Sequence, residues 1–252
     1  MKPRGNPLVI TICSLLLAVA VAAADGRPAA PAPDASATIR TLVFTGGHGF
    51  HQPSFLGMFA SNPQLTFQHV EHTKGTADGW ERADLAAFDV IVLYDMPRSF
   101  SPAQQARFRS VFPRGTGLVV LHHALVGEHQ WREYETIIGG IYPVGSDPGA
   151  AAVGYRHDLD IPVRIVDRTH PITAGLPDFI VHDEIYWGYR VGGDVTPLLR
   201  TTHPDSGNPL AWCREEGKSR IVYLQLGHGP ACMNDPNYRE LLARSIRWVA
   251  RR

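Results

Sequence analysis

The chain has 252 residues, a length that suits one large domain or two small ones. Its 24 acidic and 24 basic side chains balance, so no strong electrostatic field favours a nucleic acid or an anionic membrane. We therefore expect no nucleic-acid partner. The hydrophobic fraction of 44% is ordinary for a globular protein.

The first 24 residues have the pattern of a secretory signal peptide. Lys2 and Arg4 are basic, residues 8–23 are almost wholly apolar, and small residues at 22–24 suit cleavage. An uncleaved anchor is the alternative, although the apolar run is shorter than the ~20 residues that a span needs. We expect a secreted or periplasmic protein with no membrane contact beyond this export signal.

Residues 25–38 are rich in Ala and Pro and predict a flexible lead-in, which places the folded domain at residues 39–252. Two cysteines lie in that domain, Cys213 and Cys232. Export would permit a disulfide between them, and two buried free thiols are the alternative.

The first half of the domain alternates strand and helix patterns. Strands are predicted at residues 41–45, 65–69, 90–94 and 117–121, helices at 53–60, 102–112 and 131–138, and a short helical turn at 84–88. Ser101 and Gln104 form a capping box, and Gly139 is a typical helix end. Apolar strands that alternate with helices predict a parallel sheet covered on both faces.

The second half has few helices. Strands are predicted at residues 163–166, 179–182, 196–201, 210–213 and 221–226. A final helix begins near Asp235–Pro236 and places one apolar face on the sheet. The chain has no internal repeat, so we expect one domain.

Histidines follow three of these apolar strands at the point where each strand ends. They are His48, the pair His122 and His123, and His228. In open α/β sheets, ligands bind just beyond the carboxyl ends of parallel strands. Imidazoles from three strands at one edge predict a metal site or an acid–base site.

The neighbours of these histidines leave several alternatives open. Adjacent strand residues point to opposite faces, so His122 and His123 reach one cleft only if the chain turns there. Glu184 could bind a metal, act as a general base or orient an imidazole, or it could lie in a solvated acidic turn. His51 and His157 are weaker candidates.

The sequence lacks the motifs of two common kinds of site, the dinucleotide-binding site and the serine hydrolase active site. The glycine-rich turn at residues 46–49 does not have the G-x-G-x-x-G spacing, so we expect no nucleotide cofactor. The absence of Gly-x-Ser-x-Gly argues against a serine hydrolase.

With these residues in view, the chain resembles the ThuA-like (trehalose utilisation) family over about residues 40–250. The matching segments are residues 45–50, 121–125, 133–140, 155–158, 170–177, 183–186 and 223–229. The resemblance implies a flavodoxin-like, class I glutamine amidotransferase-like three-layer sandwich with a mostly parallel central sheet. It places His122 where an amidotransferase has its cysteine nucleophile and His228 near the amidotransferase histidine. Glutaminase chemistry is therefore not implied. Relatives often have an acid at the position of His51.

The residues and the resemblance together predict an exported enzyme that acts on a trehalose-type disaccharide or a keto-sugar by hydrolysis, isomerisation or lyase chemistry. The expected catalytic residues are His122, His228 and Glu184. The expected substrate-binding residues are His48, His157 and Tyr186. The expected metal ligands are His48, His122, His123 and His228, and Zn²⁺ is the divalent ion that suits them best. The alternative is a non-catalytic sugar-binding module on the same scaffold, and either protein could form a homo-oligomer.

Overall fold

The computed structural model describes residue 1, residues 38–127 and residues 130–252. Contacts divide the chain into Met1–Ala32 and Pro33–Arg252, and every described helix and strand belongs to the second unit. The predicted signal peptide and nearly all of its lead-in lie outside the described residues. In the part of the chain that is described, no helix has the length and apolar character to cross a membrane.

A nine-stranded sheet organises the domain, in the order β2-β1-β3-β4-β11-β10-β9-β6-β7. Parallel pairings join the first five of these strands, which are β2 (Leu65–Glu71), β1 (Ile39–Gly46), β3 (Val90–Asp95), β4 (Gly117–Leu121) and β11 (Ser219–Leu224). Antiparallel pairings add β10 (Ala211–Glu216), β9 (Thr196–Thr201), β6 (Gly154–Ile165) and β7 (Phe179–Trp187). A separate small sheet pairs β5 (Gly140–Ile141) with β8 (Arg190–Val191).

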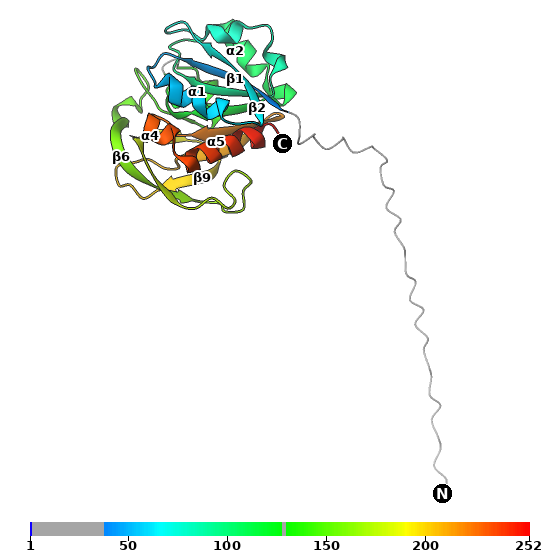
Figure 1. The fold of residues 1–252 in the computed structure, drawn as a ribbon, viewed down its shortest axis with the longest axis vertical. Helices are drawn as coiled ribbons and strands as arrows, with labels where there is room; N and C mark the ends of the chain where they lie inside the picture. Colours follow the sequence, from blue (N-terminus) through cyan, green and yellow to red (C-terminus); the bar gives the residue numbers. More distant parts are fainter. Residues whose placement is uncertain (2–37, 128–129) are drawn as a thin grey trace. The chain divides into compact units, whose positions relative to one another are not determined.

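Helices cover both faces of the large sheet, and each face has its own hydrophobic core. One face carries α1 (Gln52–Ala60), α4 (Pro230–Met233) and α5 (Pro236–Val249). The other carries α2 (Pro102–Arg109) and α3 (Arg132–Ile138). Figure 1 shows α2 and α5 on opposite sides of the sheet. The expected mixed α/β fold with a large, mostly parallel central sheet is confirmed.

Local sequence signals set several helix ends as predicted. Ser101 and Gln104 form the capping box of α2. Gly139 adopts a left-handed conformation with φ of 80° and ends α3, where a side chain would be strained. Asp235 accepts hydrogen bonds from two backbone N–H groups at the start of α5.

Strands β6 and β7 are both longer than predicted. The sequence pattern marked only residues 163–166 and 179–182, whereas β6 begins at Gly154 and β7 continues to Trp187. A register shift between Arg156 and Leu159 interrupts the alternation in β6, which is why the pattern is weak there. Glu184 therefore lies inside a buried strand, and the alternative of a solvated acidic turn is wrong.

Candidate metal centre and adjoining cavity

A sharp turn at the end of β4 brings two histidines into the interior. His122 has φ of 52°, in the left-handed region that residues other than glycine rarely adopt, and it starts the 3₁₀ helix His122–Leu125. Such a conformation costs of order 1–3 kcal/mol and is typical of functional sites. The turn buries both rings, with His122 at 0% exposure and His123 at 3%. Both histidines thus reach one region of the molecule.

Hydrogen bonds define which nitrogen of His122 carries a proton. Its Nδ1 lies 2.7 Å from the backbone carbonyl oxygen of Gln225, which can only accept, so Nδ1 donates. In the neutral ring, Nε2 then has a lone pair. That atom is 2.8 Å from Oε2 of Glu184, and two electron-rich atoms this close require a proton or a cation to bridge them.

Glu184 and His228 complete the cluster from β7 and from the turn after β11. Oε2 of Glu184 is 2.9 Å from Nδ1 of His228. Burial raises the pKa of Glu184. When protons occupy the gaps to His122 and His228, hydrogen bonds and charge from these two rings outweigh burial and hold that pKa well below its usual range. The hydrogen bond to Glu184 is the main reason that the pKa of His228 is raised. At neutral pH the centre therefore contains an ionised carboxylate that attracts a cation.

The donor atoms of these three residues suit a divalent metal ion. Nε2 of His122, Oε2 of Glu184 and Nδ1 of His228 all lie within 4.8 Å of one another. Two imidazoles and a carboxylate are a donor set that catalytic zinc sites use, with a further position left for water or substrate. Tetrahedral bonds of about 2.0–2.2 Å separate donors by roughly 3.3–3.5 Å. The observed separations of 2.8, 2.9 and 3.3 Å need only a small opening to reach that spacing.

The turn that carries His228 is held by polar side chains that the sequence patterns did not reveal. Asp183 accepts hydrogen bonds from the backbone N–H groups of Gly227, at 2.7 Å, and of His228, at 2.9 Å. The hydroxyl of Tyr94 donates to the Gly227 carbonyl at 2.9 Å. Tyr94 is the penultimate residue of β3, so the rule that sites form at strand ends could have identified it.

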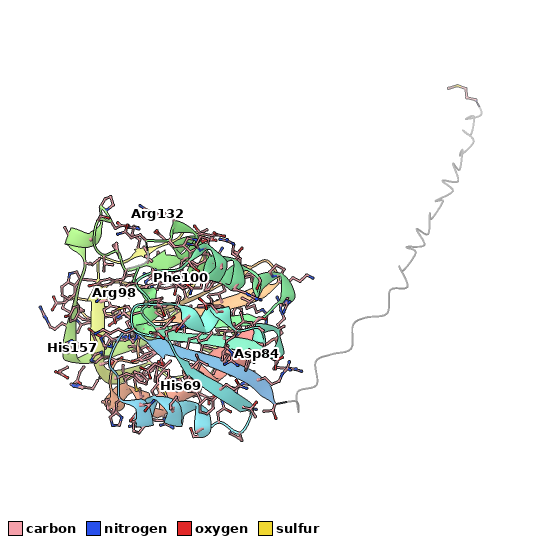
Figure 2. All side chains as sticks on the ribbon, turned by 90° about the horizontal axis from the view of Figure 1, so that it is seen from above. His69, Asp84, Arg98, Phe100, Arg132 and His157 are labelled. Carbon is pink, nitrogen blue, oxygen red and sulfur yellow. The ribbon has the colours of Figure 1, made fainter. Side chains whose placement is uncertain are left out.

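A cavity of about 280 Å³ lies beside the centre. It is lined by His48, Met96, His123, Val126, Tyr142, Val144, Tyr155, His157, Glu184 and Tyr186. Glu184 and Tyr186 belong to both the cavity and the centre, since the Tyr186 hydroxyl is 2.9 Å from Nε2 of His122. Figure 2 shows His157 at the end of the sheet opposite Asp84, where the cavity also lies.

The other histidines predicted for the site lie beside the three-residue cluster or away from it. His48 and His123 line the cavity with their rings stacked 4.5 Å apart, but the cluster of metal-binding atoms among the described residues does not include them. His157 is partly exposed, with Nδ1 3.7 Å from Oε1 of Glu184. His51 is the N-cap of α1 and accepts a hydrogen bond from the Ser54 backbone.

Burial affects the two stacked histidines more than any charge does. It lowers the pKa of His48. It also holds the pKa of His123 well below the usual value, although the nearby backbone carbonyl of Tyr94 acts in the opposite direction. Both rings are therefore neutral at neutral pH.

The two cysteines of the domain are both free and buried, so the structure has the thiol alternative and not the disulfide. Burial raises the pKa of Cys213 to about 11, which keeps this thiol protonated and unreactive at neutral pH. Neither cysteine lines the cavity.

Comparisons with known proteins agree with this architecture. The sequence profile of the ThuA family, described as trehalose utilisation, matches residues 40–249. A ThuA-like protein from Parabacteroides merdae is 19% identical with a TM-score of 0.72, covering 84% of this chain and 90% of that one. A ThuA-like protein from Bacteroides uniformis is 20% identical with a TM-score of 0.63, covering 88% and 95%.

A more distant likeness extends to a much larger protein. The cold-adapted β-galactosidase from Rahnella sp. R3 is 11% identical with a TM-score of 0.57, over 83% of this chain and 31% of that one. At such identities, the likeness to these solved structures shows the fold alone. The comparison with curated proteins gives no match.

Proposed function

Because the chain belongs to the ThuA (trehalose utilisation) family, we propose that it is an exported, metal-dependent enzyme of carbohydrate metabolism. Its ion, for which Zn²⁺ is best suited, is held by His122, Glu184 and His228. The observation that carries this proposal is the convergence of three donor atoms from different strands within 4.8 Å, beside a cavity. The substrate is a trehalose-type disaccharide or its keto derivative.

The side chains around the centre have complementary tasks in such an enzyme. A bound divalent ion would polarise a substrate carbonyl or activate a water molecule. Burial, reinforced by the charge of Glu184, raises the pKa of Tyr186 well above its usual range. Tyr186 thus remains protonated and donates a hydrogen bond to a substrate oxygen. The other carboxylate oxygen, Oε1, is 3.7 Å from Nδ1 of His157 at the cavity, and in such an enzyme it would take the general-base role of Glu184.

Metal analysis of the purified mature protein tests this proposal. We expect about one zinc ion per chain, lost in the His122→Ala/His228→Ala double variant. His182→Ala is the matched control, because His182 is exposed and pairs with Asp160 away from the cavity. No bound metal in the wild type, together with an unchanged affinity for trehalose in the double variant, would contradict the proposal.

Export requires a separate test. Cell fractionation and amino-terminal sequencing should find a mature chain that begins near Asp25 outside the cytoplasm. A chain that keeps residues 1–24 and sediments with membranes would support the uncleaved anchor.

A non-catalytic sugar-binding module is the second candidate. The aromatic lining of the cavity favours it, because Tyr142 and Tyr155 offer flat faces that a sugar ring can contact without any reaction. Zinc-loaded protein that binds trehalose and 3-keto-trehalose, yet leaves both unchanged in NMR spectra, would support this candidate over the enzyme.

A further inference from the structure

His123 is a buried histidine whose ring nitrogens lack hydrogen bonds. Its residue exposure is 3%, and neither Nδ1 nor Nε2 meets the distance and angle of a hydrogen bond to another protein group, although the Tyr94 backbone carbonyl lies near the ring. A buried polar atom left unpaired costs about 1–3 kcal/mol, and such atoms normally have a partner in native proteins. Both nitrogens are closed to solvent, but the ring lines the cavity, so a molecule there that shifts the ring slightly can supply that partner.

Packing holds the ring of His123 in this position. Its edge meets the ring of Tyr94, with centroids 4.3 Å apart and planes at 60°, and it stacks on His48 at 4.5 Å. Tyr94 is itself fixed by its hydrogen bond to the Gly227 carbonyl. These aromatic neighbours hold the ring beside the cavity.

The surroundings of His123 suit an uncharged ligand that carries hydroxyl groups. Among the described residues that line the cavity there is no Lys or Arg, the side chains that bind phosphate or carboxylate groups strongly. The polar atoms of the lining come from imidazoles, phenols and one carboxylate. A neutral imidazole has one N–H group and one lone pair that point away from each other, and a sugar hydroxyl group can accept from the first or donate to the second.

We propose that His123 is a specificity-determining residue that hydrogen-bonds a hydroxyl group of an unphosphorylated sugar ring. This inference rests on the proposed function only in taking the cavity as the sugar site, and it does not require the metal ion. A sugar without that hydroxyl leaves His123 unpaired in the complex, so it binds more weakly. A variant without ring nitrogens loses this discrimination.

Calorimetric titration with a deoxy-sugar series tests the proposal. The zinc-loaded wild type and the His123→Leu variant are titrated with D-glucose, its 2-, 3-, 4- and 6-deoxy analogues, and glucose 6-phosphate. For the wild type, we expect one deoxy analogue to bind about 5- to 100-fold more weakly than glucose. For His123→Leu, that analogue and glucose should bind with affinities within about twofold, because the interaction is already absent.

Two further variants make the result specific to the ring nitrogens. His123→Gln keeps a donor and an acceptor and should restore part of the discrimination. His182→Leu changes an exposed histidine outside the cavity and should retain the wild-type ratio. Glucose 6-phosphate should bind the wild type at least about tenfold more weakly than glucose, since the lining offers the phosphate no cationic side chain.

Several results would overturn the proposal. These are equal deoxy-to-glucose ratios in the wild type and His123→Leu, no binding of any of these sugars by the wild type, or equal binding of glucose and its phosphate. Zinc content measured on the same samples separates the two hypotheses. If zinc is bound but His123→Leu keeps the wild-type ratio of deoxy-sugar to glucose affinity, only the role of His123 is wrong. If His123→Leu changes that ratio but no zinc is bound, only the metal-dependent function is wrong.

Discussion

His72 and His122 are both buried beside a carboxylate at the ends of parallel strands, but their hydrogen bonds run in opposite directions. Nδ1 of His72 accepts from the backbone N–H of Gly79 at 2.9 Å. In the neutral ring the proton therefore lies on Nε2, which donates to Asp95 at 3.1 Å. In His122 a backbone carbonyl takes the Nδ1 proton, and the lone pair of Nε2 faces Glu184.

The comparison shows that the backbone partner of one ring nitrogen decides what the other nitrogen offers. When Nδ1 accepts from a backbone N–H group, as in His72, the ring proton lies on Nε2 and is donated to the carboxylate. The His72–Asp95 pair then has a complete hydrogen bond. A backbone carbonyl, as at His122, leaves the lone pair of Nε2 next to a carboxylate oxygen, and the His122–Glu184 pair then needs a proton or a metal ion between its two atoms. The surroundings of the two pairs also differ. Phe44 stacks on His72 at 4.9 Å, whereas Glu184 of the other pair lines a cavity.

The largest expected effect is on folding and concerns the complete pair. His72→Ala leaves the Asp95 carboxylate buried without its partner, and we expect the free energy of unfolding to fall by about 3–5 kcal/mol. Zinc content should stay unchanged. Urea unfolding and metal analysis check both statements, and a loss of zinc without a loss of stability would reverse the assignment of the two pairs.

Glu184→Gln should have the next largest effect, and it acts on the metal. Apparent binding energies of about 10–16 kcal/mol for four-ligand zinc sites suggest that one ligand contributes roughly 100- to 1,000-fold in affinity. Competition with a chromogenic chelator measures this loss. Asp95→Asn is the matched control, since it alters the carboxylate of the other pair and should retain wild-type zinc affinity.

Tyr186→Phe should have a smaller effect on the same centre. The variant removes the hydroxyl that lies 2.9 Å from Nε2 of His122, and groups that orient a ligand typically contribute about 10- to 100-fold in metal affinity or activity. Tyr189→Phe is the control, because the Tyr189 hydroxyl bonds the Pro209 carbonyl away from the centre. If Tyr186→Phe and Tyr189→Phe had the same zinc affinity and the same sugar turnover, Tyr186 would have no role in the centre.

The smallest expected effect is a pH dependence of stability from His72. Burial lowers the pKa of His72, but Asp95 and Asp78 together raise it above the usual value. A raised pKa in the folded state contributes stability at low pH that is lost as the pH rises through that pKa. In Asp95→Asn one of the two raising charges is removed while Asp78 remains, so this loss should shrink. Urea unfolding at about pH 5.5 and about pH 8 compares the variant with the wild type.

The sequence predicted the sheet edge where the candidate centre lies, because the ends of apolar strands can be read directly from residue order. His122, His123 and His228 were placed correctly at that edge by this reasoning. It did not predict that Glu184 is buried, since β6 and β7 meet through a register shift that a single strand pattern cannot show. It also could not give the tautomer of His122, which depends on a carbonyl 103 residues away.

The left-handed backbone of His122 has an evolutionary consequence. A lineage that no longer used the ring would relieve this backbone strain by drifting to Gly or Asn, which tolerate that conformation better, at the cost of a cavity and an unpaired Gln225 carbonyl. A ThuA-like chain with Gly or Asn at this position would therefore be one that has lost the centre. Such a chain should retain less zinc than its own Gly→His or Asn→His revertant.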